Sequence, residues 1–196
     1  MAINFPKKSD INSLEAAAQS GQWRGAAPVH LWDPPFCGDI DIEIRREGSW
    51  WHEGRPIKRK GMAELFASIL LYEKGEHFLV TPAEKVRIRV EDCPFLITEL
   101  RIENAGDPSS QRLLVRTSLG EEVSIGPQHP LIIGVDRVDA VGNKEPHPTV
   151  DMRAGLLGLV SRSVFYQLAE LVEAHAGDRE SEVFGVWSEG VFFPLA

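Results

Sequence analysis

The strongest constraint on the fold of this chain is a strict alternation of charged and apolar residues in two segments. In residues 38–45 (GDIDIEIR), three isoleucines alternate with Asp39, Asp41 and Glu43. In residues 84–92, Val86, Ile88 and Val90 alternate with Lys85, Arg87 and Arg89. Because successive side chains of a strand point to opposite faces, each segment predicts a strand with one buried and one solvated face.

The two solvated faces carry opposite charge. Side chains on one strand face repeat at roughly 6.6 to 7 Å, a spacing that suits a single metal ion poorly, so no metal site is predicted for the acidic stripe. Opposite charges that face each other across neighbouring strands stabilise a sheet by about 0.2 to 1 kcal/mol per pair. We therefore predict that some of these acids lie beside the basic stripe.

The rest of the chain predicts further strands and three helices. Helical spacing of apolar residues predicts a short first helix from residue 10 to 20 and a second from residue 61 to Gly75. A long third helix is expected to carry Leu157, Val160, Val164, Leu168, Leu171 and Val172 and to end at Gly177. Further strands are expected at residues 49–52, 76–81, 95–103, 112–117, 121–125, 130–134, 135–141, 182–187 and 191–193. Residues 27–36 and 142–149, rich in proline, are expected to be irregular.

The stretch ENAGDPSSQR, residues 103–112, is the best predicted domain boundary because it combines Gly, Asp, Pro and two serines. We expect an N-terminal helix and arm at residues 1–27, a first lobe at 28–104 and a second lobe at 105–196. Each half offers strands, one amphipathic helix and more strands. The predicted fold class is α+β, with two small lobes built on a duplicated strand-helix-strand motif.

Composition excludes several classes of partner. The 196 residues carry a formal net charge of -8, which argues against nucleic acid or anionic membrane as a partner. No leader and no apolar run of about twenty residues is apparent, so a cytoplasmic protein is expected. Cys37 and Cys93 lie far apart and are interpreted as buried thiols rather than a disulfide or ligand pair.

Catalytic signatures are missing from the sequence. There is no phosphate-binding G-x-x-x-x-G-K-[ST] loop, no G-x-G-x-x-G, no G-x-S-x-G and no H-E-x-x-H, and no two of the six histidines stand at metal-ligand spacing. Catalytic groups can also converge from distant positions. The prediction leans away from an enzyme, and neither a catalytic residue nor a cofactor is predicted.

A local basic cluster is the main candidate for ligand binding. Lys58, Arg59 and Lys60 precede the second predicted helix, whose N-terminal dipole itself favours anions. With Lys85 and Arg87 they could hold a phosphate-bearing ligand; the alternative is scattered surface cations that confer solubility. On the third predicted helix, Arg162 and its neighbour four residues on, Tyr166, could both reach a cleft, although surface packing is the simpler interpretation.

Several ordered motifs resemble one bacterial family. The segments GDIDIEIRREGSWWHEGRPI, LFASIL, FLVTPAEKVRIRVEDCPF, SRSVFYQLAEL and GVWSEGVFFPL are similar to the family catalogued as domain of unknown function 1285. The resemblance implies a two-domain α+β fold with a duplicated motif and a C-terminal half that is superficially pleckstrin-homology-like. It also implies a site for a nucleotide-like ligand at the domain interface and a role in signalling under oxidative stress.

The segments typical of that family complete the set of candidate residues. We expect Thr81, Glu84 and Lys85 of LVTPAEK and Trp187 and Ser188 of GVWSEG to lie near the ligand. An aromatic ring such as that of Trp187 could stack a base, or could simply fill a core.

Three functional hypotheses follow. The leading one is a signalling module that binds a small anionic, nucleotide-like ligand. The second is an enzyme that uses Glu84 or Glu73 as a base. The third is a protein-interaction adaptor that binds a peptide at a sheet edge. A homodimer is left open as a further partner.

Overall fold

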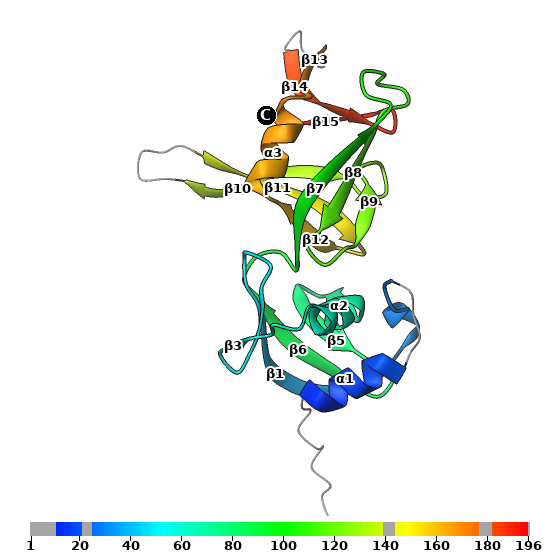
Figure 1. The fold of residues 1–196 in the computed structure, drawn as a ribbon, viewed down its shortest axis with the longest axis vertical. Coiled ribbons are helices and arrows are strands. Elements are labelled where there is room, and N and C mark those ends of the chain that lie inside the picture. Colours follow the sequence, from blue (N-terminus) through cyan, green and yellow to red (C-terminus); the bar gives the residue numbers. More distant parts are fainter. Residues whose placement is uncertain (1–10, 21–24, 139–143, 177–181, 196) are drawn as a thin grey trace, which may run out of the picture. The chain divides into compact units, whose positions relative to one another are not determined.

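The computed structural model describes residues 11–20, 25–138, 144–176 and 182–195. They form two compact units, Met1–Pro94 and Phe95–Ala196. Both are mixed α+β and consist mostly of sheet (Figure 1). None of the helices in the described residues is long and apolar enough to span a membrane.

The first unit is a six-stranded sheet with helices packed on one face. Its strands are β1 (Phe36–Ile44), β2 (Trp50–His52), β3 (Arg55–Pro56), β4 (Leu70–Glu73), β5 (Glu76–Val80) and β6 (Lys85–Val90). They lie in the order β3-β2-β1-β6-β5-β4, and only the central pair, β1 and β6, is parallel.

Two helices belong to the same unit. Helix α2 (Lys60–Ser68) buries Met62, Ala63, Phe66 and Ala67, and the ring of Phe66 lies 6.1 Å from that of Trp50 on β2. Helix α1 (Ile11–Ser20) packs beside α2 (Figure 1). It buries Leu14 and Ala18. A short 3-10 turn, η1 (Val29–Leu31), contacts β4.

The second unit repeats the same sheet order. Its strands are β7 (Phe95–Glu103), β8 (Arg112–Thr117), β9 (Glu122–Ser124), β10 (Leu131–Val138), β11 (Lys144–Arg153) and β12 (Leu156–Val160). They lie in the order β10-β11-β12-β7-β8-β9, with β12 and β7 as the parallel central pair. Each unit therefore consists of two antiparallel meanders of three consecutive strands. The first strand of the earlier meander pairs with the last strand of the later one, β1 with β6 and β7 with β12.

The second unit also has one helix and a small sheet. Helix α3 (Arg162–Ala169) follows the last meander and packs its buried Val164 and Leu168 toward β7. The three-stranded sheet β13-β14-β15 comprises β13 (Glu173–Ala176), β14 (Glu182–Ser188) and β15 (Val191–Pro194). It contacts β8 and β10 of the large sheet.

The structure confirms the α+β class and most of the predicted strands, and it corrects both longer helices. The second helix ends at Ser68 rather than Gly75, because Leu70–Glu73 turns back on β5 as strand β4. The third is only Arg162–Ala169: Leu156–Val160 is strand β12, and Glu173–Ala176 is β13. Gly177 lies outside the described residues.

Two predicted loops and the predicted boundary also differ. Most of the expected loop at 142–149 belongs to β11, which pairs with β10 despite Pro146 and Pro148. The proline-rich arm contains η1. Residues 104–111 connect β7 to β8 inside the second unit, and the units divide about ten residues earlier, at Pro94. Of the two cysteines, Cys93 is buried and Cys37 is half-buried.

Candidate functional site

The acidic and basic stripes lie side by side in the first unit, as predicted. Parallel pairing of β1 with β6 places Asp39 opposite Arg87 and Glu43 opposite Arg89. Arg87 binds both carboxylate oxygens of Asp39, at 2.8 and 3.0 Å, and Glu76 at 2.6 Å. We call this set the strand ladder: Lys85, Arg87 and Arg89 with Asp39, Asp41, Glu73 and Glu76.

Electrostatics in the strand ladder are compensated. Hydrogen bonds from Arg87 lower the pKa of Asp39, and Lys85 likewise lowers the pKa of Glu73. Hydrogen bonds to Asp39 and Glu76 in turn raise the pKa of Arg87. A groove of about 510 Å³ along the ladder is lined by four carboxylates and two guanidinium groups, from Asp39, Glu43, Glu76, Glu91, Arg87 and Arg89. The predicted anion contacts Lys85 and Arg87 thus already have carboxylate partners, in acidic surroundings.

A second hollow, of about 320 Å³, lies at the N-terminal end of α2, and we call it the α2 hollow. Its basic lining comes from His52, Arg55, Lys58 and Arg59, and among the described residues Glu53 is the one acidic lining residue. Ile11, Pro56, Ile57 and Met62 complete the wall. Within the described residues, Arg55 and Lys58 form no ion pair, whereas Arg59 pairs with Glu15 at 3.1 Å.

Local backbone structure accounts for the position of these cations. The β2–β3 hairpin turns at Glu53 and Gly54, both with positive φ, and returns the chain toward α2. Arg59 occupies the N-cap position in an extended conformation, and its carbonyl accepts hydrogen bonds from the Met62 and Ala63 amides. The hollow therefore faces the positive end of the helix dipole. Sequence reasoning selected Lys58 and Arg59 but missed Arg55, whose signal is its place in the basic segment RPIKRK.

Thr81 and Glu84 form a turn outside this hollow. The buried Thr81 hydroxyl accepts hydrogen bonds from the Ala83 and Glu84 amides, at 3.3 and 3.2 Å. That geometry is a local side-chain turn that joins β5 to β6. The structure does not bring Thr81 or Glu84 into the lining of the α2 hollow.

The remaining predicted residues belong to the second unit. Arg162 and Tyr166 are exposed on α3, and Arg162 lies 3.4 Å from Glu145. The half-buried Trp187 ring packs with His175 and Phe192, at centroid distances of 5.1 and 5.3 Å. A ligand pocket shared by the two units stays a prediction.

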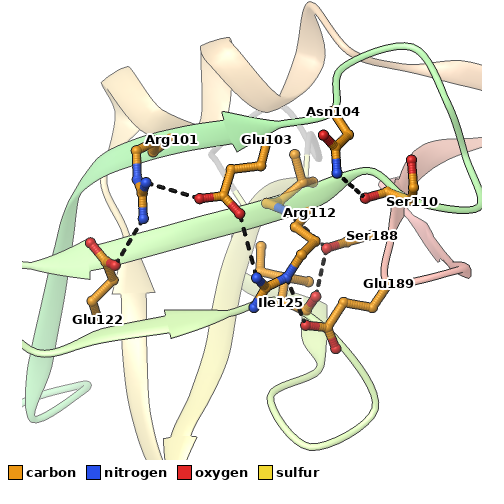
Figure 2. Close-up of polar contacts among 10 residues, drawn as sticks. Arg101, Glu103, Asn104, Ser110, Arg112, Glu122, Ile125, Ser188 and Glu189 are labelled. Atoms are coloured by element: carbon orange, nitrogen blue, oxygen red, sulfur yellow. Dashed lines mark hydrogen bonds and ion pairs between the residues drawn. The ribbon is translucent and has the colours of Figure 1, made fainter.

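Ser188 has a structural role that the sequence did not reveal. Its side chain is fully buried; the hydroxyl donates to the Ile125 carbonyl at 2.6 Å and accepts from the Leu113 amide at 3.0 Å. It is thereby inserted between β8 and the end of β9 (Figure 2). Gln111 supports the same hairpin, since its side-chain amide donates to the Trp187 carbonyl at 2.7 Å.

Figure 2 also shows a second chain of ion pairs, which sequence reasoning missed. Successive side chains pair at nitrogen–oxygen distances of 2.9 to 3.5 Å, in the order Glu122, Arg101, Glu103, Arg112 and Glu189. The signal was the alternation of Glu99, Arg101 and Glu103 along β7, the same pattern as in the first unit. The chain links β7, β8 and β9 to the β14–β15 turn, and both of its guanidinium groups have carboxylate partners.

Comparisons with known proteins agree on one family for residues 27–195. Residues 27–93 match the model of the N-terminal domain of DUF1285, a domain of unknown function, and residues 94–195 match that of its C-terminal domain. The crystal structure of a DUF1285 family protein from Silicibacter pomeroyi DSS-3 is 44% identical, with a TM-score of 0.81 over 93% of each chain. Another, from Shewanella baltica OS155, is 32% identical over 66% of this chain and 90% of that one, with a TM-score of 0.49. Among curated proteins no match was found.

Proposed function

Since the chain belongs to the DUF1285 family, whose function is unknown, we propose from its own geometry that it is a binding module for a small anionic ligand held in the α2 hollow. One observation supports this most directly. In the strand ladder every cation has a carboxylate partner, whereas Arg55 and Lys58 line the hollow with no ion pair within the described residues.

The chemistry of the hollow suits a phosphate group. Guanidinium and ammonium groups beside a helix N-terminus provide charge and directed N–H donors for an anion. A volume of about 320 Å³ lies at the lower end of the range for small-molecule sites, roughly 300 to 1,000 Å³. The apolar wall of Ile57 and Met62 could contact the rest of a nucleotide-like molecule.

The proposal extends to the role of the whole protein. We retain ligand-dependent signalling, with oxidative stress as its context and the cytoplasm as its location. We also propose that the second unit is pleckstrin-homology-like and that the protein forms a homodimer. All of these are proposals that follow from the resemblance and the sequence.

The alternative function, an enzyme with Glu84 or Glu73 as general base, has less support in the case of Glu73. A general base at neutral pH works best with a pKa near 7. Lys85 shifts the pKa of Glu73 in the opposite direction, below its ordinary value. Glu73 is thus a poor base, and the binding module remains the preferred function.

Thermal-shift measurements with pyrophosphate, mononucleotides and cyclic dinucleotides test the proposal. A ligand at 100 times its Kd stabilises the native state by about 2.7 kcal/mol, which is measurable as a rise in Tm. We expect Lys58→Ala to weaken this response and Arg116→Ala, which removes one exposed cation in the second unit, to preserve it. Uniformly absent shifts at millimolar ligand would overturn the proposal.

A further inference from the structure

We propose that helix α1 regulates the α2 hollow as an intramolecular competitor, in which the carboxylate of Glu15 occupies Arg59 in place of the anionic ligand. This inference rests on the proposed function of the hollow. It concerns the control of ligand binding, and it assigns a role to a helix that precedes the residues matched by the family model, 27–93.

The ion pair between Glu15 and Arg59 is the first support. An oxygen of Glu15 lies 3.1 Å from a terminal nitrogen of Arg59. The Glu15 side chain is only 18% exposed, whereas that of Arg59 is 69% exposed. The other Glu15 oxygen accepts a hydrogen bond from Gln19 at 3.2 Å. The carboxylate is therefore held in position against the guanidinium, as the carboxylate or phosphate of a ligand would be.

The packing of α1 is the second support. Leu14 and Ala18 are almost completely buried, and α1 contacts α2 directly. Ile11, in the first turn of α1, forms part of the wall of the hollow. One helix thus supplies both a wall residue and the counter-charge of a basic lining residue.

Competition follows from these contacts. A multivalent anion that enters the hollow can bind Arg55 and Lys58 directly. It can bind Arg59 only if the carboxylate of Glu15 first releases that guanidinium group. Exposed ion pairs are worth about 0.2 to 1 kcal/mol, so removal of the Glu15 charge should tighten anion binding by about 1.4- to fivefold. By reciprocity, a bound anion should loosen α1.

Calorimetric titration of the full chain with pyrophosphate tests the inference. Glu15→Gln preserves the size of the side chain and removes its charge, so we expect a Kd about 1.4 to five times lower than that of the unaltered protein. Glu99→Gln, which removes an exposed carboxylate that pairs with Arg116 in the second unit, is the matched control and should leave the Kd unchanged. Amide hydrogen exchange of α1 in the unaltered protein is the second measurement, and saturating pyrophosphate should accelerate it.

The outcomes separate this inference from the proposed function. If the unaltered protein and Glu15→Gln bind pyrophosphate equally, or if pyrophosphate slows exchange in α1, the competitor role is wrong and the hollow remains a binding site. If neither protein binds pyrophosphate or any nucleotide, the proposed function is wrong and the regulation with it.

Discussion

At the scale of single residues, the hydroxyl of Ser188 offers the sharpest test of the fold. It satisfies the Leu113 amide and the Ile125 carbonyl in a fully buried position. Ser188→Ala should lower the free energy of unfolding by about 1 to 3 kcal/mol, because it leaves buried backbone groups without a partner. Urea unfolding followed by tryptophan fluorescence measures this change. Ser163→Ala, at an exposed position of α3, is the control, and an equal effect of both substitutions would contradict the role of Ser188.

The same residue shows what a sequence pattern cannot provide. Ser188 was predicted as a ligand contact, but its hydrogen-bond partners lie 75 and 63 positions away along the chain. No local spacing indicates such partners. Asp39 and Arg87 lie 48 positions apart, yet the proximity of their stripes was predicted, because two stripes of opposite charge and equal period indicate neighbouring strands.

At the scale of elements, two-residue turns ending in glycine explain both helix errors. Where both residues have positive φ, the turn matches the twist of a tight hairpin. Lys74-Gly75 is such a turn, although Gly75 was predicted as a helix end, and Ala154-Gly155 is another, in a segment for which no turn was predicted. Apolar residues three and four apart then resembled a helical stripe, although the burial of Leu156, Gly158 and Val160 alternates as in a strand.

The turn at Gly75 leads to a stability prediction at this scale. Gly75 has φ +84°, and a Cβ added there would meet no atom within 4 Å, so the cost of Gly75→Ala is one of backbone conformation alone. We expect a loss of about 1 to 2 kcal/mol, measured by urea unfolding. Gly61→Ala in α2 is the matched control: it has equally open surroundings and should gain up to about 1 kcal/mol from helix propensity. A gain at both positions would contradict the assigned turn.

At the scale of the whole molecule, the two units share one sheet order, which the sequence indicated only coarsely. Repetition of strands and an amphipathic helix in each half was predicted, and local meanders follow from short turns. A central parallel pair joins the two meanders of each unit: the charge stripes indicated β1 with β6, whereas no sequence pattern indicated β12 with β7. The helix also differs in chain position: α2 lies between the two meanders of its unit, whereas α3 follows both.

The response to acid is a property of the whole molecule, and it should occur in two stages. Burial lowers the pKa of His77, whose ring lies 4.9 Å from that of Tyr72. The native state therefore resists a proton that the unfolded chain accepts near pH 6.5, so stability should begin to fall as the pH drops below about 6.5. Asp39 and Glu73 have lowered pKa values because of Arg87 and Lys85, and their contribution is complete above about pH 4.5 and lost below it.

Measurement of Tm from pH 8 to pH 3 separates the two stages. His77→Gln removes the group that titrates in the upper stage, so its Tm should stay nearly level between about pH 7 and pH 5 and then fall with that of the unaltered protein. His30→Gln, at an exposed position of η1, removes one imidazole without touching Tyr72 and should retain both stages. If His77→Gln and the unaltered protein lose Tm in parallel over the upper stage, the destabilisation arises elsewhere, because the desolvated imidazole is the only group changed between them.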